Sequence, residues 1–280
     1  MKKSCKILTI GAVGILVSAL MTTPSFAESS ASDDQPYSQP EPDQDGWFHY
    51  EDSLPADAEI YTIQGTSDGE GGCHFEDSAS LSPGEDLVST QEVAYNPETC
   101  ESRLATSDAP IGGEDSPPSE GEDPGQEGQE EEADLEEAQP STEEADAQTR
   151  SSGRLWSWYE DPPGIKVTEA ENRTTWSWDG SNVLSSPAPV GGYTLRHFST
   201  SGWSLEEQNW QNSYNSNQTT SSSYAHFRNG IFCAGITTHA YADRNTVHGQ
   251  ANGDLDGAWN WSKSGGCNGL LSFNNQLERT

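Results

Sequence analysis

The sequence predicts an all-β protein whose C-terminal half, residues 151–280, forms a Trp-rich antiparallel sandwich or jelly-roll-like domain. Short runs of alternating apolar and polar residues are bounded by Gly, Asn, Asp and Pro, and no helical period of useful length competes with them. Eight of the nine tryptophans also lie in this half. Such spacing is typical of sandwiches and jelly rolls. The expected strands are residues 155–159, 165–168, 174–178, 193–198, 224–227, 231–241, 246–251, 258–262 and 270–273.

Residues 46–105 are expected to form a small β module linked by a disulfide. The strand candidates are residues 60–63, 74–81 and 87–95, each of which ends at a Gly or Pro turn signal. So short a piece has little core of its own. It therefore either depends on its disulfide or packs against the C-terminal half.

The net charge of −33 comes almost entirely from residues 28–150. Residues 28–150 hold 35 Asp or Glu against only Arg103 and Arg150, which gives −33 for this segment alone. Nucleic acid is a poor partner for so acidic a chain, because its phosphates are repelled.

A disordered acidic linker is expected at residues 106–150. This stretch contains only Ile111 and Leu135 as sizeable apolar side chains, so burial cannot offset the entropy of ordering. Its composition favours a solvated tether over a binder of Ca²⁺ or cationic surfaces. A second disordered acidic segment is expected at residues 28–45.

The N-terminus, residues 1–27, has the pattern of a signal peptide. Three lysines precede an apolar stretch at residues 7–21, and Ser25-Phe26-Ala27 provides a small-x-small cleavage site. The apolar stretch is short for a membrane span. We therefore expect a secreted, extracellular protein without a membrane span after cleavage.

Four cysteines remain after this cleavage: Cys73, Cys100, Cys233 and Cys267. In an oxidising compartment they should form disulfides, and three pairings are open to them. We expect the local pairs, Cys73 with Cys100 and Cys233 with Cys267, because the acidic linker separates the two halves. A zinc site is disfavoured because no C-x-x-C spacing is present.

Three Trp-x-Trp pairs recur in the C-terminal half. The period of two along a strand places both rings of a pair on one face. The rings could form either a dense core, which is favoured, or an exposed wall that stacks on sugar rings. The candidate ligand-binding residues are therefore Trp156, Trp158, Trp176, Trp178, Trp259 and Trp261.

A hairpin is expected around a two-residue turn at Asp243 and Arg244. This turn would place His239 opposite His248 on the outer face, where a transition metal would still need a third ligand. We therefore expect no metal site. The buried face of the first strand is expected to include Phe232, Ala234, Ile236 and Ala240.

Residues 252–257 match the first half of a calcium-binding loop. Asn252, Asp254 and Asp256 place oxygen atoms at alternate positions, but Lys263 stands where a bidentate Glu is needed. A β-turn is the favoured alternative to a Ca²⁺ site, and no cofactor is expected.

The function that the sequence favours is binding to the cell envelope or to an extracellular polymer such as a polysaccharide. The G-x-S-x-G and H-E-x-x-H motifs are absent, so the sequence favours a protein without enzymatic activity over an enzyme. A glycosidase-like secreted hydrolase and a structural or inhibitory extracellular protein are the alternatives. The oligomeric state is left open.

Three segments carry a family resemblance: residues 95–102 (YNPETCES), 159–165 (YEDPPGI) and 225–235 (AHFRNGIFCAG). They resemble segments of an uncharacterised family of secreted actinobacterial proteins. The resemblance implies a secreted bacterial protein and assigns no activity and no site residues.

Overall fold

The structure is a computed structural model that describes residues 41–50, 54–69, 71–110, 149–162 and 164–280. The expected signal peptide at 1–27, most of the acidic segment at 28–45 and nearly all of the linker at 106–150 lie outside these residues.

An eight-stranded antiparallel sheet contains strands from both ends of the sequence. Its order is β2, β6, β5, β14, β7, β8 and β9, with β1 beside β5. The strands are β1 (Phe48–His49), β2 (Glu59–Gln64), β5 (Leu87–Asn96), β6 (Glu101–Ser107), β7 (Thr149–Glu160), β8 (Lys166–Trp178), β9 (Val190–His197) and β14 (Ser272–Arg279).

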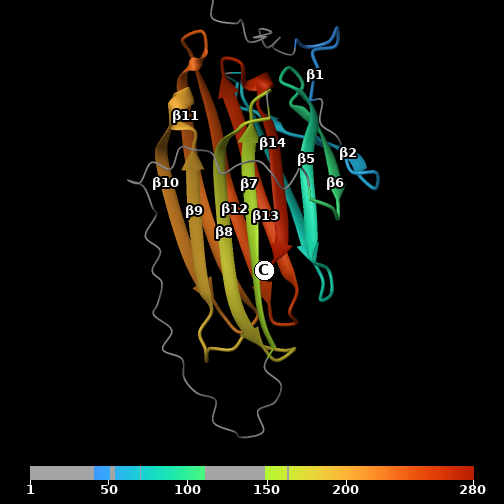
Figure 1. Ribbon diagram of the computed structural model, residues 1–280, viewed down its shortest axis with the longest axis vertical. Helices are drawn as coiled ribbons and strands as arrows, with labels where there is room; N and C mark the ends of the chain where they lie inside the picture. The colour runs from blue at the N-terminus through green and yellow to red at the C-terminus, as the bar shows by residue number, and fades with distance from the viewer. Residues whose placement is uncertain (1–40, 51–53, 70, 111–148, 163) are drawn as a thin grey trace, which may run out of the picture. The chain divides into compact units, whose positions relative to one another are not determined.

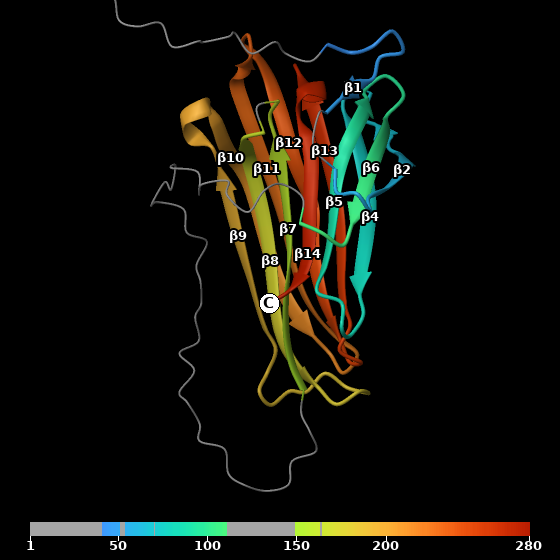
Figure 2. The ribbon, with the colours of Figure 1, turned by 45° about the vertical axis from the view of Figure 1, so that its right-hand side comes forward.

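A six-stranded antiparallel sheet packs against it in the order β10, β11, β12, β13, β4 and β3. The strands are β3 (Thr66–Ser67), β4 (Cys73–Leu81), β10 (Trp203–Tyr214), β11 (Gln218–Cys233), β12 (Ile236–Gln250) and β13 (Leu255–Gly265). Two short 3₁₀ helices, η1 (Ser199–Ser201) and η2 (Asn268–Leu270), lie in connections. The long strands of both sheets lie along nearly the same axis in Figures 1 and 2, with neighbouring strands pointing in opposite directions. The two sheets confirm the predicted all-β antiparallel class.

Residues 46–105 and 151–280 contribute strands to the same two sheets. Strand β4 pairs with β13 in the six-stranded sheet, and β5 pairs with β14 in the eight-stranded sheet. The described residues between 41 and 280 accordingly form one compact unit. Of the two possibilities left open for the small module, packing against the C-terminal half is therefore the one observed.

The chain crosses from one sheet to the other at Gly65, between β2 and β3. A Cβ at this position would lie 2.6 Å from the Phe75 ring and 2.7 Å from the carbonyl oxygen of His74. The crossing therefore requires a residue without a side chain.

Aromatic rings fill the core beside this crossing. The Trp261 ring stacks on Phe75 at 5.2 Å between centroids and on Phe273 at 4.2 Å. Phe75 and Trp261 come from the six-stranded sheet and Phe273 from the other, so the stack joins the two layers. Large buried rings of this kind contribute much of the apolar area removed from water.

The core also holds a fully buried ion pair. Lys263 on β13 donates from Nζ to Oε2 of Glu92 on β5 at 2.6 Å, and both side chains are completely buried. Nζ also donates to the carbonyl oxygen of Leu271 at 2.6 Å and to the Tyr50 hydroxyl at 3.3 Å. Every ammonium proton therefore has an acceptor, which offsets part of the cost of desolvating the charge, and burial still lowers the pKa of Lys263.

Polar side chains occupy the middle of the inter-sheet space. Ser157 on β7 donates to Oδ1 of Asn245 on β12 at 2.7 Å, and Asn245 donates to the carbonyl oxygens of Leu155 and Ala170 at 3.3 and 3.0 Å. Pairing these atoms avoids the penalty for burying polar groups, and it links the two sheets by directional bonds.

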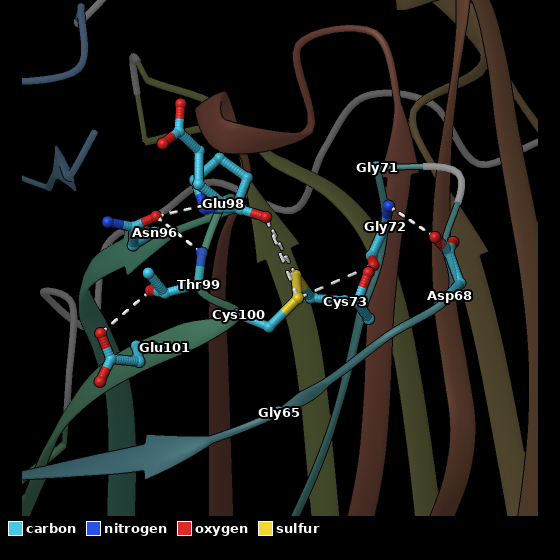
Figure 3. Close-up of a disulfide and its surroundings, with 12 residues drawn as sticks. Gly65, Asp68, Gly71, Gly72, Cys73, Asn96, Glu98, Thr99, Cys100 and Glu101 are labelled. Carbon is cyan, nitrogen blue, oxygen red and sulfur yellow. Dashed lines mark hydrogen bonds between the residues drawn. A yellow bond between two sulfur atoms is a disulfide. The ribbon is translucent and has the colours of Figure 1, made fainter. Parts of the chain in front are cut away.

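The two predicted disulfides, Cys73–Cys100 and Cys233–Cys267, are both formed. Figure 3 shows the first of them beside a turn in which Oδ1 of Asn96 accepts from the backbone N–H groups of Glu98 and Thr99. The two bridges lie at the same end of the sandwich, because Asn268, next to Cys267, donates to the carbonyl oxygen of Gly71 at 2.8 Å.

The predicted hairpin turn at Asp243 and Arg244 is wrong. Strand β12 continues through both residues, and the register shift between Ala242 and Arg244 makes Asp243 a β-bulge. The actual turn is at Ala234 and Gly235, where φ is 48° and 89°. Positive φ at both central residues is the requirement of a type I′ hairpin turn.

The expected buried face of this strand is therefore only partly correct. Ala240 is buried and Phe232 packs partly against the core. Ala234 is exposed in the turn, and Ile236 is 61% exposed beside it.

Other strands also differ from expectation: β6 is not among the candidates, and two further cases are β8 and β10. The separate candidates 165–168 and 174–178 are one strand, β8. Strand β10 was not predicted, because its Glu, Gln, Asn and Ser residues lack an apolar alternation and it is the exposed edge of its sheet.

We predict that Lys263→Met lowers the free energy of unfolding by about 3–5 kcal/mol, because Glu92 is left buried without its cation. Adding Glu92→Gln should recover part of this loss, since no buried charge remains. Urea denaturation measures both effects. The matched control is Arg228→Met, which removes an exposed ion pair with Glu206 and should cost no more than about 1 kcal/mol. Equal losses for Lys263→Met and Arg228→Met would contradict the prediction.

Candidate functional site

Two of the three tryptophan pairs face the interior and the third faces outward. Trp259 and Trp261 point inward from β13 and are buried. Trp176 is buried against Gly249, and Trp178 is partly buried beside the β12–β13 turn. The six rings therefore do not form one exposed wall, and their role in ligand binding stays a prediction.

Trp156 and Trp158 point outward from β7, but Lys166 covers them. Their ring centroids are 4.6 Å apart, and the ammonium of Lys166 lies 3.8 and 4.5 Å from the two centroids. Desolvation by the surrounding groups lowers the pKa of Lys166. Trp158 is only 3% exposed. This pair offers little ring surface to a ligand.

Four of the six histidines in the sequence point outward from the six-stranded sheet. They are His74 on β4, His226 on β11, and His239 and His248 on β12. Each is partly exposed and alternates with buried neighbours on its strand. The sheet therefore gathers on one surface side chains that lie far apart in the sequence.

A ring cluster occupies the part of this surface formed by β11 and β12. His226 lies directly opposite Tyr241, and Arg228 directly opposite His239. We name the outward side chains of this region the His–Tyr face. Its residues are Tyr224, His226, Arg228, His239 and Tyr241.

The rings of the His–Tyr face are held in a fixed arrangement. His226 stacks on Tyr241 with centroids 4.3 Å apart and an interplanar angle of 14°. Nε2 of His226 lies 2.9 Å from Nδ1 of His239, within hydrogen-bonding distance. One imidazole donates to the other, and the rings are thereby ordered before any ligand arrives.

The charges around the cluster are mixed. Burial is the main cause that lowers the pKa of both His226 and His239. The neighbouring His239 lowers the pKa of His226 further, and Arg228 lowers that of His239. The carboxylate of Glu206 opposes both shifts. Both rings are therefore mainly neutral at pH 7.

The bulge at Asp243 connects the cluster to the neighbouring strands. Oδ2 of Asp243 accepts from the Ser262 hydroxyl at 2.7 Å and lies 3.1 Å from Nδ1 of His74. The carboxylate stands between the hydroxyl and the imidazole, so His74 is not placed to take the proton of Ser262. The arrangement orders side chains and does not form a Ser-His-Asp triad.

Paired polar side chains continue the surface along the strands. Thr220 bonds to His248 at 2.8 Å, and Arg244 donates to Asn260 at 2.9 Å. The predicted pairing of His239 with His248 is wrong, because both lie on β12. The missed bulge at Asp243 explains the error.

The calcium-like segment is a tight turn between β12 and β13. Asn252 donates to Oδ2 of Asp254 at 2.6 Å, and Gln250 donates to Oδ2 of Asp256 at 2.6 Å. The two carboxylates thus accept hydrogen bonds from the turn and from the strand beside it, and the segment has the β-turn structure that is the favoured alternative.

No helix within the described ranges is long and apolar enough to cross a membrane.

We predict that the free energy of unfolding falls between pH 7 and pH 5.5, and that His226→Gln combined with His239→Gln makes this fall smaller. The folded-state pKa values are lower than the unfolded value of about 6.5. The unfolded chain therefore binds more protons in this range, so the stability is complete above the unfolded pKa of about 6.5 and is lost as the pH falls from there through the lower folded-state pKa values. Urea denaturation at several pH values measures the slope. Equal slopes for the wild type and the double variant would contradict the assignment.

No protein-family model, curated protein or solved structure matches this chain.

Proposed function

We propose that this is a secreted binding protein that uses the His–Tyr face to hold an extracellular polysaccharide of the cell envelope or its surroundings. The single observation that carries the proposal is the stack of His226 on Tyr241, partly exposed on an open sheet surface. An aromatic ring beside hydrogen-bonding side chains suits a sugar, which has both apolar C–H faces and hydroxyl groups.

The surroundings of the stack supply these hydrogen-bonding groups. Asn209 and Glu207 on β10 lie beside Tyr224 and His226 and are exposed. Arg228 is exposed on the other side of the cluster. An interface for a folded protein would be expected to present a more apolar centre, whereas outward positions of β11 and β12 are mainly Ser, Thr, Gln, His and Tyr.

The dimensions of the surface suit an extended ligand. Strand β12 has 15 residues. At about 3.3 Å per residue it spans roughly 50 Å, and polar pairs such as Ser222–Thr246 continue along it. A linear polymer could therefore contact the sheet over several units, and the already ordered side chains would lose little entropy on binding.

Covalent chemistry and the sequence support the proposed location. Both disulfides are formed, and such bridges persist in oxidising compartments. The N-terminal residues 1–27 have the pattern of an export signal.

Co-sedimentation with insoluble bacterial cell wall, chitin and cellulose tests the proposal. The protein should be retained on at least one of them, and retention should persist at high salt because ring stacking is less sensitive to ions than charge pairing. His226→Ala combined with Tyr241→Ala should reduce retention at least tenfold. The assay contains a chelator, so that bound metal ions have no part in it.

Trp156→Ala is the matched control, since it also removes an outward ring but from the other sheet. It should leave retention unchanged. Thermal melting shows that each variant is folded. Loss of retention only in Trp156→Ala would move the site to the eight-stranded sheet, and no retention of the wild type on any polymer would refute the proposal.

A further inference from the structure

The pair formed by His226 and His239 has the geometry of a two-nitrogen metal chelate. Nε2 of His226 and Nδ1 of His239 are 2.9 Å apart. Metal–imidazole bonds are about 2.0–2.1 Å long, so two nitrogens at a right angle around one ion lie about 2.9 Å from each other. Both nitrogens can therefore reach one ion at ordinary bond lengths once the two rings turn their lone pairs towards it.

We propose that His226 and His239 together bind a transition-metal ion, with Cu²⁺ preferred. This inference goes beyond polymer binding and departs from the expectation of no metal site. The cis arrangement of two imidazoles suits the square-planar geometry of Cu²⁺, and Cu²⁺ binds nitrogen ligands more tightly than the other divalent first-row ions.

The protonation of the pair permits coordination. A neutral imidazole has one ring nitrogen with a free lone pair, and coordination needs both facing nitrogens to present theirs. The ring that donates the hydrogen bond has to move its proton to its other nitrogen, and both facing lone pairs are then available. The metal thus replaces the shared hydrogen bond.

The neighbouring charges set the strength of the site. Arg228 lies directly opposite His239 and repels a cation, but its guanidinium is 3.7 Å from the carboxylate of Glu206. Glu206 is exposed at the irregular position of β10 and is electrostatically coupled to both imidazoles. Along the described part of the chain, no three His, Cys, Asp or Glu side chains are grouped to hold a metal. The remaining positions would therefore be filled by water, which makes the ion exchangeable.

Titration of the tag-free full chain with Cu²⁺, followed by electron paramagnetic resonance and calorimetry, tests the inference. The wild type should bind one ion with hyperfine structure from two nitrogens. His226→Ala and His239→Ala each remove a direct ligand, so each should weaken binding by at least the 10- to 100-fold that is typical for loss of an outer-shell partner.

His248→Ala is the matched control, because this histidine is on the same surface of β12 and bonds to Thr220 instead. Its Cu²⁺ affinity should equal that of the wild type. Unchanged affinity in both His226→Ala and His239→Ala would overturn the inference, as would a wild-type spectrum without nitrogen coupling. The wild-type spectrum can overturn the inference by itself, so the test does not depend on the folding of a variant. The Cu²⁺ titration contains no polymer, and the co-sedimentation assay contains a chelator. Failure of metal binding and failure of polymer binding are therefore observed separately.

Discussion

The ion pair between Lys263 and Glu92 is the interaction on which the arrangement of the two sheets depends. Its ammonium is held by a carboxylate from β5, a carbonyl from the segment before β14 and a hydroxyl from the segment after β1. Together with the ammonium itself, which comes from β13, these groups come from four parts of the sequence. A fully buried charge tolerates little displacement of its partners, since a missing bond would leave it unsolvated. The pair thereby fixes how the six-stranded sheet faces the eight-stranded one.

The same interaction explains why the early and late parts of the chain fold together. Glu92 also accepts from Ser102 and from the backbone N–H of Phe273, so its carboxylate joins β6 and β14 as well. Neither the small N-terminal part nor the C-terminal half could satisfy these atoms alone. Shared sheets, rather than the disulfide alone, compensate for the small core of residues 46–105. The sequence could not show this, because each partner is ordinary in isolation and their meeting depends on long-range pairing.

Local patterns predicted the strands well where one residue faces the core and the next faces water. Burial alternates along β4, β7 and β13 for this reason, whereas β5 is buried along most of its length. The prediction from alternation failed at Asp243, because a bulge adds one residue and exchanges the inward and outward positions: Ala240 is buried before it and Val247 after it. A reversal of the pattern and a turn look alike in a sequence, and Ala234-Gly235 lacks the Asn or Asp that often marks a hairpin.

The bulge also decides which side chains reach the candidate site. With a turn at Asp243, His239 and His248 would have faced each other across a hairpin. In the continuous strand, His239 instead meets Arg228 and His226 of β11, and His248 meets Thr220. The ring cluster therefore depends on pairing between β11 and β12, whose turn lies close to the Cys233–Cys267 bridge. Because the bridge joins the end of β11 to the segment before β14, it holds the strand that carries His226 to the disulfide-linked end of the sandwich. The outward surface is thus ordered by the same contacts that stabilise the core, which allows exposed polar and aromatic groups to remain in place without a ligand.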